Sequence, residues 1–476
     1  PALSYSTDTV HQVFTVPAHP LEGHRRPAPR SPGGGRSDMA RRYTDPVNRR
    51  LRTIRYAGLT AATVLAAAAF LAGALPSGDP GPDLRLLGLG AMPPGFQFGL
   101  VGFAAALVGW LLVWRRLAVV THRDPARPGM RWVAGTGLLW SVPLLLAPPL
   151  ASRDPYSYAC QGWLLATGGD PYSHSPLAGD CPYLAAVAPL WRDTTAPYGP
   201  LGVALTAIGA GPAAALPAPD QTRLLITLGL LRLVALGGVL LTGWGVARLA
   251  SRCGIAPTKA LVLGVATPLT ALHAVAGAHN DAVLAGLVVT GLAVVAGSRA
   301  VSTNRALITA VASGVALGLA TSIKITAVVA VPFAALLAAG AAGQQPGGPA
   351  TRGSRGSPLT GTTVGVVGGA AAAHAAVLAA TELGFGWLAS LGATASSVQW
   401  TSVPSALGMC AGYLLRALGH PAATPVAVAV ARLTGLAAEK GIRCLSLHAS
   451  DLGRPIYSKA GFVPEVLNRK VIDEVI

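Results

Sequence analysis

The residues best suited to chemistry lie in one polar stretch, residues 152–200, which interrupts an otherwise apolar chain. Its first acid, Asp154, follows Arg153 and comes four residues after the end of an apolar run. A carboxylate in this place could act as a general base that removes a proton from an acceptor hydroxyl. Because it would lie at a membrane interface and not in hydrocarbon, we expect it to cost little to ionise. The competing interpretation is an ordinary Asp that caps a short helix over residues 157–163.

The same stretch is rich in proline turns and aromatic side chains. An X-Pro-Tyr motif begins at each of four residues: Asp154, Asp170, Cys181 and Ala196. Each proline fixes its own φ and disfavours helix at the residue before it, so we expect Asp154 and Asp170 on turns and not on helix faces. The aromatic side chains could form a belt at the lipid headgroups or stack on sugar rings. Tyr156 and Trp191, with Asp170, are the candidates for substrate binding here, and Trp400 of a later outer segment is a further one.

Three basic side chains and a polar pair are placed where an anion could bind. Arg153, His279 and Lys324 are expected at one membrane surface, and such groups suit a phosphate as point charges or through a bidentate guanidinium. Lys324 lies between two apolar runs, so it either snorkels to the interface or meets an anion. Asn280 and Asp281 follow His279 and precede an apolar run. They either cap its helix or bind phosphate or sugar hydroxyls at the helix start.

The cysteine spacing predicts no zinc site but allows a disulfide. The five cysteines contain no CxxC pair and no Cys/His ligand spacing, so zinc is not expected. Cys160 and Cys181 share the polar stretch, and they pair if that stretch faces an oxidising compartment or otherwise remain free thiols. The sequence shows no dedicated site for another metal, and a divalent ion as cofactor stays open.

The chain that must position these residues has the composition of a polytopic membrane protein. It has 476 residues, of which 52% are hydrophobic and 12% charged, and these values indicate many bilayer spans. The formal charge of +17 does not indicate nucleic acid, because the arginines lie in short stretches between apolar runs, as the positive-inside rule describes. Since open sheet edges are not tolerated in hydrocarbon, we expect an all-α bundle of about 10–12 transmembrane helices with a large extracytoplasmic loop.

Apolar runs give the order of these spans. They are expected at residues 56–75, 98–114, 132–150, 224–249, 260–276, 282–296, 306–321, 327–342, 362–383, 405–418 and 425–438. The run 201–216 is shorter than the roughly 20 residues that a span needs, and we expect it to be re-entrant. With the arginine clusters inside, the polar stretch faces the extracytoplasmic side.

Several segments together resemble the polyprenol-phosphomannose-dependent α-1,6-mannosyltransferases, which are integral-membrane glycosyltransferases of the GT-C fold. The matching pieces are SRDPYSYACQGWLLATGGDPY (152–172), WRDTTAPYGPLGVAL (191–205), GAHNDAVLAGLVVTGLA (277–293), SIKITAVVAVPF (322–333) and WTSVPSALG (400–408). These pieces occur in consistent order between residues 50 and 437.

The resemblance implies a function and a site. It implies transfer of mannose from polyprenyl monophosphomannose to a lipid-linked mannan acceptor, a lipoglycan, at the outer face of the plasma membrane, with inversion and an α-1,6 linkage. The base of GT-C enzymes is an Asp of a large extracytoplasmic loop, and Asp154 takes that position. The donor phosphate would meet Arg153, His279 and Lys324, because the protein must mainly position groups and stabilise charge.

Two terminal segments differ from the membrane domain, residues 51–438. Residues 1–50 are rich in Pro, His, Arg and Gly. We expect a disordered, basic cytoplasmic tail, or an over-extended gene start with Met39 as the alternative beginning. Residues 439–465, EKGIRCLSLHASDLGRPIYSKAGFVPE, resemble the C-terminal part of a GNAT N-acetyltransferase. The segment 439–476 is too short for that domain, so we expect a fragment without acetyltransferase activity.

A polytopic transporter or a lipid-linked sugar flippase is the alternative for such a chain. A transporter would place acids and broken helices near the bilayer centre, often in two repeated halves. Here the acids crowd the polar stretch and no repeat is visible. An acetyltransferase fused to a membrane anchor is a third hypothesis, and the missing coenzyme-binding half argues against it.

Overall fold

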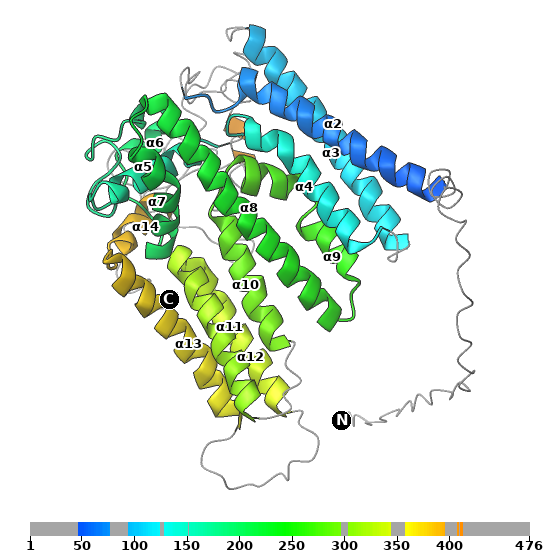
Figure 1. The fold of residues 1–476 in the computed structure, drawn as a ribbon, viewed down its shortest axis with the longest axis vertical. Coiled ribbons are helices and arrows are strands. Elements are labelled where there is room, and N and C mark those ends of the chain that lie inside the picture. The colour runs from blue at the N-terminus through cyan, green and yellow to red at the C-terminus, as the bar shows by residue number, and fades with distance from the viewer. Residues whose placement is uncertain are drawn as a thin grey trace, which may run out of the picture. The chain divides into compact units, whose positions relative to one another are not determined.

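The regular structure of the chain is helical (Figure 1). The fold is seen in a computed structural model, which describes residues 46–76, 94–123, 128–150, 152–296, 303–343, 358–395, 407–408 and 410–412. No strand occurs in these ranges, which confirms the all-α class. Five helices are long and apolar enough to cross a membrane: α2 (Pro46–Ala72), α3 (Pro94–Arg123), α8 (Asp220–Arg252), α11 (Thr303–Ile323) and α13 (Pro358–Thr381).

Shorter apolar helices accompany the five long ones. They are α4 (Met130–Leu146), α7 (Pro200–Ala214), α9 (Pro257–Gly264), α10 (Asp281–Ala296), α12 (Ala330–Gly343) and α14 (Trp387–Ala395). The expected total of ten to twelve spans stays a prediction, because the segment 425–438 and most of 405–418 lie outside the described residues. The basic tail before residue 46 and the acetyltransferase-like segment after 438 lie outside them too.

One expected span is broken. The sequence predicted a continuous helix over residues 260–276, and this was wrong. The chain leaves α9 at Gly264 and resumes after Pro268 as a short π-helix, η3 (Thr270–Ala276). Proline cannot donate the backbone hydrogen bond that would continue the preceding turn, and it disfavours helix at the residue before it. The helices η3 and α10 then meet at a bend of 116°, so together they form one candidate bent span.

Two apolar cores hold the helices together. In the first, α2, α3, α4 and α9 surround Trp110 and Trp140, whose rings meet edge to face with centroids 6.0 Å apart. In the second, α10 to α13 approach closely because of small residues. A Cβ at Gly314 or Gly318 of α11 would lie 2.1 or 2.2 Å from a backbone oxygen of α13, so a larger residue would push the two helices apart.

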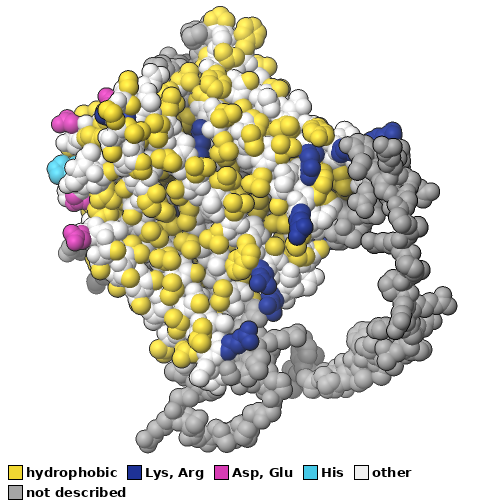
Figure 2. Space-filling model, viewed as in Figure 1, with side chains coloured by type: hydrophobic (Ala, Val, Ile, Leu, Met, Phe, Trp, Pro, Cys, Tyr) yellow, Lys and Arg dark blue, Asp and Glu magenta, His cyan; other side chains and the backbone are white. Residues whose placement is uncertain are grey.

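Charged side chains gather at two ends of the described helices (Figure 2). Most Lys and Arg side chains of the face shown lie along one margin, Asp, Glu and His lie along the opposite margin, and apolar side chains cover most of the surface between them. The helix ends show the same division, since α8 begins at Asp220 and ends at Arg252, and α3 ends at Arg123. The expected pattern of a membrane-spanning bundle with one basic end is therefore present.

The polar stretch and α7 form a cap, residues 152–214, at the acidic end. Its helices are α5 (Asp154–Ala166), η2 (Leu184–Ala186), α6 (Pro189–Arg192) and α7. Close contact between α5 and α7 requires Gly162, where a Cβ would lie 2.3 Å from the Thr206 carbonyl oxygen. Gly209 of α7 packs on Leu231 of α8 in the same way. With 15 residues, α7 is too short for an ordinary span.

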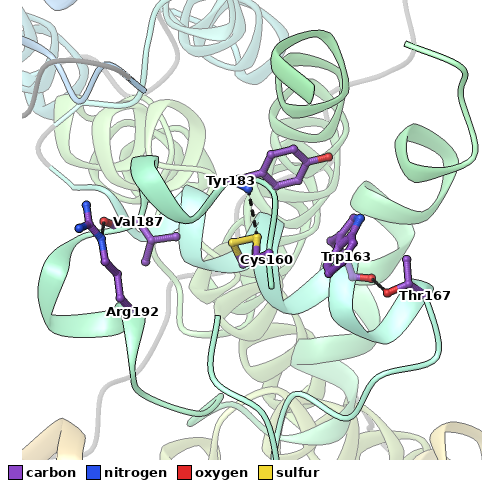
Figure 3. Close-up of a disulfide and its surroundings, with 7 residues drawn as sticks. Cys160, Trp163, Thr167, Tyr183, Val187 and Arg192 are labelled. Carbon is purple, nitrogen blue, oxygen red and sulfur yellow. Dashed lines mark hydrogen bonds between the residues drawn. A yellow bond between two sulfur atoms is a disulfide. The ribbon is translucent and has the colours of Figure 1, made fainter. Parts of the chain in front are cut away.

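A disulfide fastens the cap to itself (Figure 3). It joins Cys160 of α5 to Cys181, which precedes η2, and so pairs the two cysteines that the sequence left open. The Tyr183 N–H donates to the Cys181 sulfur at 3.4 Å, and Nε of Arg192 donates to the Val187 carbonyl at 3.0 Å. These contacts hold the loop against the outer side of α5.

Candidate functional site

Four segments that are distant in the sequence meet at the acidic end of the bundle. Asp154 at the start of α5 places its Oδ2 4.0 Å from Nδ1 of His279. The Tyr158 hydroxyl lies 3.0 Å from the same nitrogen and 3.2 Å from the hydroxyl of Tyr198. Nζ of Lys324, the residue after α11, lies 5.9 Å from the centre of the Tyr198 ring. The predicted base and two of the three predicted phosphate ligands are thus brought together.

Asp154 is the first residue of α5, so the expectation that it lies on a turn was wrong. The following Pro155 stands at the first helical turn, where its missing N–H has no partner to lose. The Asp154 N–H donates to an acceptor outside the helix, the Ser152 hydroxyl oxygen, at 3.0 Å. Because a proline disfavours helix in the residues that precede it, Pro155 prevents the helix from extending further toward the N-terminus than Asp154.

The Asp154 carboxyl is costly to ionise, which corrects the expectation drawn from its interfacial position. Its side chain is 31% exposed. Burial raises the pKa of Asp154 above its ordinary value, and the Asp281 charge adds to this, while the Ser152 hydroxyl, His273 and Lys324 act against it. A carboxylate with a raised pKa binds protons more strongly near neutral pH, as a general base should.

A strained backbone sets the position of His279. Ala278 before it has φ +47°, in the left-handed region that residues other than glycine rarely adopt. Gly277 cannot carry a side chain, because a Cβ there would lie 2.6 Å from the His273 carbonyl oxygen and 2.7 Å from a His279 ring carbon. Ala278 is buried against Tyr158 and Leu231. Strain held in place by packing is a frequent property of functional sites.

The buried Tyr158 contacts the His279 ring, and the half-buried Tyr198 contacts Tyr158 in turn. Burial raises the pKa of both Tyr158 and Tyr198 above the ordinary tyrosine value, so both hydroxyls stay protonated at neutral pH. A tyrosine hydroxyl that donates to Nδ1 leaves Nε2 of a neutral histidine as the protonated nitrogen. In that tautomer His279 offers an N–H donor on the side of its ring away from Tyr158.

Lys324 and Asp281 form an ion pair beside this network. Their Nζ and Oδ1 atoms are 3.0 Å apart, and the two side chains are 38% and 34% exposed. The pair fixes the lysine ammonium at the start of α10 and leaves part of it accessible. An ammonium in this place can meet an anion without leaving its carboxylate partner.

Asn280 and two residues of α5 have buried polar atoms without partners in the described part of the chain. Both side-chain polar atoms of Asn280 are of this kind, as are the Ser157 hydroxyl and Oε1 of Gln161. The three side chains are only 5–6% exposed. A buried polar group without a hydrogen bond costs about 1–3 kcal/mol, so native proteins rarely keep such groups without a reason.

His273 is a member of the site that the sequence reasoning missed. Its ring stacks on that of His279 with centroids 4.0 Å apart and an angle of 14° between the planes. The available signal was the sequence HAVAGAH after Pro268, which puts two histidines on either side of a helix break.

His273, His279 and Asp281 could also be considered as metal ligands, since one ligand atom from each lies within 4.8 Å of the others. The in-plane lone pairs of two stacked rings run parallel and do not converge on one ion. Lys324 also places a positive charge at Asp281. A divalent ion would therefore need one ring to turn, whereas hydrogen bonding to an anion needs no such change.

Two predicted residues have structural contacts away from Asp154. Nη1 of Arg153 donates to the Ala186 carbonyl at 2.9 Å and so ties α5 to η2. Tyr156 is fully buried, its hydroxyl donates to the Ala74 carbonyl, and burial raises its pKa to about 12. The proposed phosphate and substrate roles of these two residues stay predictions.

Three other predicted residues are not seen at the site in the described part of the structure. Asp170 does lie on a turn, where its Oδ1 accepts the Tyr172 N–H at 2.9 Å. Trp191 packs beside the apolar cluster that contains the disulfide. Trp400 lies outside the described residues. Their substrate-binding roles stay predictions.

Arg232 of α8 is a second residue that the sequence reasoning did not use. It is 6% exposed and donates to the carbonyls of Leu145, Ala147 and Ala276 at 2.8, 2.6 and 3.3 Å. These carbonyls end α4 and η3, so Arg232 holds the broken span beside α8. A lone Arg inside an apolar run was the signal, because such charges are rare in spans.

Known proteins are similar in sequence to most of this chain, including the candidate site. The family described as "Alpha-(1->6)-mannopyranosyltransferase, N-terminal domain" matches residues 55–340, which include Asp154, His279 and Lys324. A Mycolicibacterium smegmatis protein named a probable alpha-(1->6)-mannopyranosyltransferase is 31% identical over 81% of this chain and 69% of its own length.

Two other relatives are named alpha-(1->6)-mannopyranosyltransferase A. The one from Corynebacterium glutamicum is 34% identical over 53% of this chain and 50% of its own length. The one from Mycobacterium tuberculosis is 30% identical over 70% of this chain and 59% of its own length. No solved structure matches the chain.

Proposed function

Because this chain belongs to the α-(1→6)-mannopyranosyltransferase family, we propose that it transfers mannose from polyprenyl monophosphomannose to a lipid-linked mannan acceptor. The proposed reaction takes place at the outer face of the plasma membrane and forms an α-1,6 linkage with inversion. The observation that carries the proposal is the placement of the Asp154 carboxylate 4.0 Å from His279, with Lys324 in the same cluster.

The proposed mechanism uses Asp154 as the base. Its carboxylate takes the proton of the acceptor's 6-hydroxyl as that oxygen attacks the anomeric carbon. The bond between this carbon and the phosphate oxygen breaks, and the electron pair leaves with polyprenyl phosphate. One inversion converts a β-linked mannosyl phosphate to an α-mannoside. The raised pKa of Asp154 supports this role.

The leaving phosphate would lie against the basic side of the cluster. Lys324 supplies a fixed positive charge, and the His279 and His273 rings supply hydrogen-bond donors. Donors that are already in place stabilise charge that develops in a transition state without a cost of reorganisation. Sugar hydroxyls would satisfy the unpartnered amide of Asn280, and Ser157 and Gln161 could serve the same purpose on α5.

Two observations support the extracytoplasmic side for this site. The Cys160–Cys181 disulfide lies in the cap, and disulfides persist in oxidising compartments. The basic helix ends lie at the opposite end of the bundle, as expected for the cytoplasmic side of a membrane protein (Figure 2).

A transporter is the second candidate, because the bent pair of η3 and α10 is a broken helix with ionisable residues at its break. The break, however, lies beside the cap at one end of the described bundle, whereas a transporter would place it near the bilayer centre. The family favours transfer over transport.

The test uses the purified full chain in vesicles with radiolabelled polyprenyl-phosphomannose and a short α-mannoside acceptor. Transfer predicts a labelled acceptor that is one mannose longer and sensitive to an α-1,6-specific mannosidase. A labelled nucleotide sugar in place of the lipid donor should give no product. Movement of the labelled lipid between leaflets without a longer acceptor would support the transporter and contradict the proposal.

A further inference from the structure

A cavity of about 550 Å³ lies between α3 and α9, away from the cap. Its lining includes Arg115, His122, Arg123 and Lys259, with Trp114 and Leu263 among the apolar members. We call it the basic pocket. Near its middle, α4 packs through Gly137 against Ala266, which follows α9, whereas the last residues of α4 reach Arg232 and the helix break. The length of α4 therefore separates the basic pocket from the candidate active site.

The charge of the basic pocket is one-sided. Arg115, Arg123 and Lys259 carry fixed positive charges, His122 lies in the same lining, and no Asp or Glu of the described residues lines the cavity. Basic side chains that line one cavity repel one another, and an anion bound between them would relieve this repulsion. A phosphate group is the common biological anion of matching size, and guanidinium groups bind it in a bidentate manner.

The walls of the basic pocket are apolar, and they continue into a surface that faces lipid. Val119 and Leu263 are 40% and 61% exposed, and Leu112 further along α3 is 55% exposed. The two walls are held at a fixed distance, because the Trp114 indole N–H donates to the Val262 carbonyl at 2.9 Å. A ligand that fills this cavity should thus combine a phosphate with hydrocarbon chains.

We propose that the basic pocket binds the phosphate headgroup of an anionic diacyl phospholipid, whose acyl chains lie along α3. Basic pockets between transmembrane helices at the end that carries the positive charges are suited to such headgroups. The bound lipid would bridge Arg115 and Arg123 of α3 to Lys259 of α9 and so stabilise the contact between these two helices. This site is separate from the donor site, and the inference does not depend on the proposed function.

The test measures thermal unfolding of the full chain in detergent as phosphatidylglycerol replaces phosphatidylcholine. The lipid should raise the melting temperature of the wild-type protein in a saturable manner, and native mass spectrometry should show one retained anionic lipid. The variant R115Q/K259Q should bind about tenfold more weakly or worse, because each cation near an anionic lipid contributes to affinity. Inorganic phosphate at the same concentration should give no comparable shift.

The matched control is R252Q, which removes a charge from the end of α8, outside the pocket lining. It should respond to phosphatidylglycerol like the wild type. If the double variant does not fold, K259Q alone replaces it as the test variant. Equal lipid responses of K259Q and wild type, an equal loss in R252Q, or an equal shift with inorganic phosphate would each overturn the proposal.

Discussion

Asp154 and His279 come from different helices, yet their Oδ2 and Nδ1 atoms lie 4.0 Å apart. One stands at the start of α5 in the cap, and the other stands in the break before α10. Pro155 in the first turn of α5 and the strained Ala278 set the positions of these two residues. The pair therefore couples a candidate base to the part of the chain that would bind the donor phosphate.

The rate of mannose transfer should fall as the pH is lowered. The fall should occur at a higher pH than it would if the base were a carboxyl with an ordinary pKa. Burial raises the pKa of Asp154 above its usual value of about 3.9, and the base works only when it is ionised. The measurement is the pH dependence of kcat/KM, followed to a pH below the ordinary Asp pKa. An acid limb centred at or below the ordinary Asp pKa would contradict the prediction.

The substitution D154N should raise thermal stability at neutral pH. A carboxyl with a raised pKa in the folded state stabilises the fold when protonated, and this contribution is lost as pH rises through the folded-state pKa. The amide of D154N cannot ionise, so the variant does not lose this stability as the pH rises. Melting temperatures should therefore differ near pH 7 and converge at low pH, where Asp154 itself is protonated. A lower melting temperature of D154N than of wild type near pH 7 would contradict the inference that ionised Asp154 destabilises the fold.

The substitution N280A should reduce transfer without reducing stability. The Asn280 amide has no hydrogen-bond partner among the described residues, so its removal breaks no contact within them. A lost hydrogen bond to substrate corresponds to about a tenfold decrease in kcat/KM. N304A, at an exposed site near the start of α11, is the control and should leave both quantities unchanged. A large drop in melting temperature without a change in kcat/KM would assign Asn280 a structural role.

The substitution R232L should destabilise the protein strongly. It would leave the carbonyls of Leu145, Ala147 and Ala276 without their donor, at a cost of about 1–3 kcal/mol for each buried group. R232K should recover only part of the stability, because one ammonium cannot reproduce the planar arrangement of guanidinium donors. The measurement is thermal unfolding in detergent, with R248L as the control because Arg248 lies over the ring of Trp244 at the surface. Equal melting temperatures of R232L and R248L would contradict the assignment.

The sequence was sufficient to place Asp154, His279 and Lys324 at one end of a helical bundle. Counting apolar runs decides which ends of helices lie together, because each crossing reverses the side of the membrane. The same counting placed the segments 152–200 and 277–281 on the same side of the membrane, although they are distant in the chain. The structure brings both to the acidic end.

The environment of these residues could not be derived in the same way. Burial of the Asp154 carboxyl depends on how closely the cap packs, which follows from contacts such as Gly162 with Thr206 and not from hydropathy. The participation of His273 depends on the break after Gly264, and an apolar run across Pro268 does not by itself reveal one. Local sequence patterns report periodicity and turns, whereas these features arise from tertiary packing.

The most direct measurement compares initial rates of mannose transfer by wild type, D154N and D220N, with polyprenyl-phosphomannose and an α-mannoside acceptor at saturating concentrations. Asp220 is an exposed carboxylate at the start of α8, 3.4 Å from Arg223, and serves as the matched control. Loss of a general base predicts a rate about 10²- to 10⁴-fold lower for D154N and an unchanged rate for D220N. Equal rates for D154N and wild type would remove Asp154 from the mechanism and leave this account without its base.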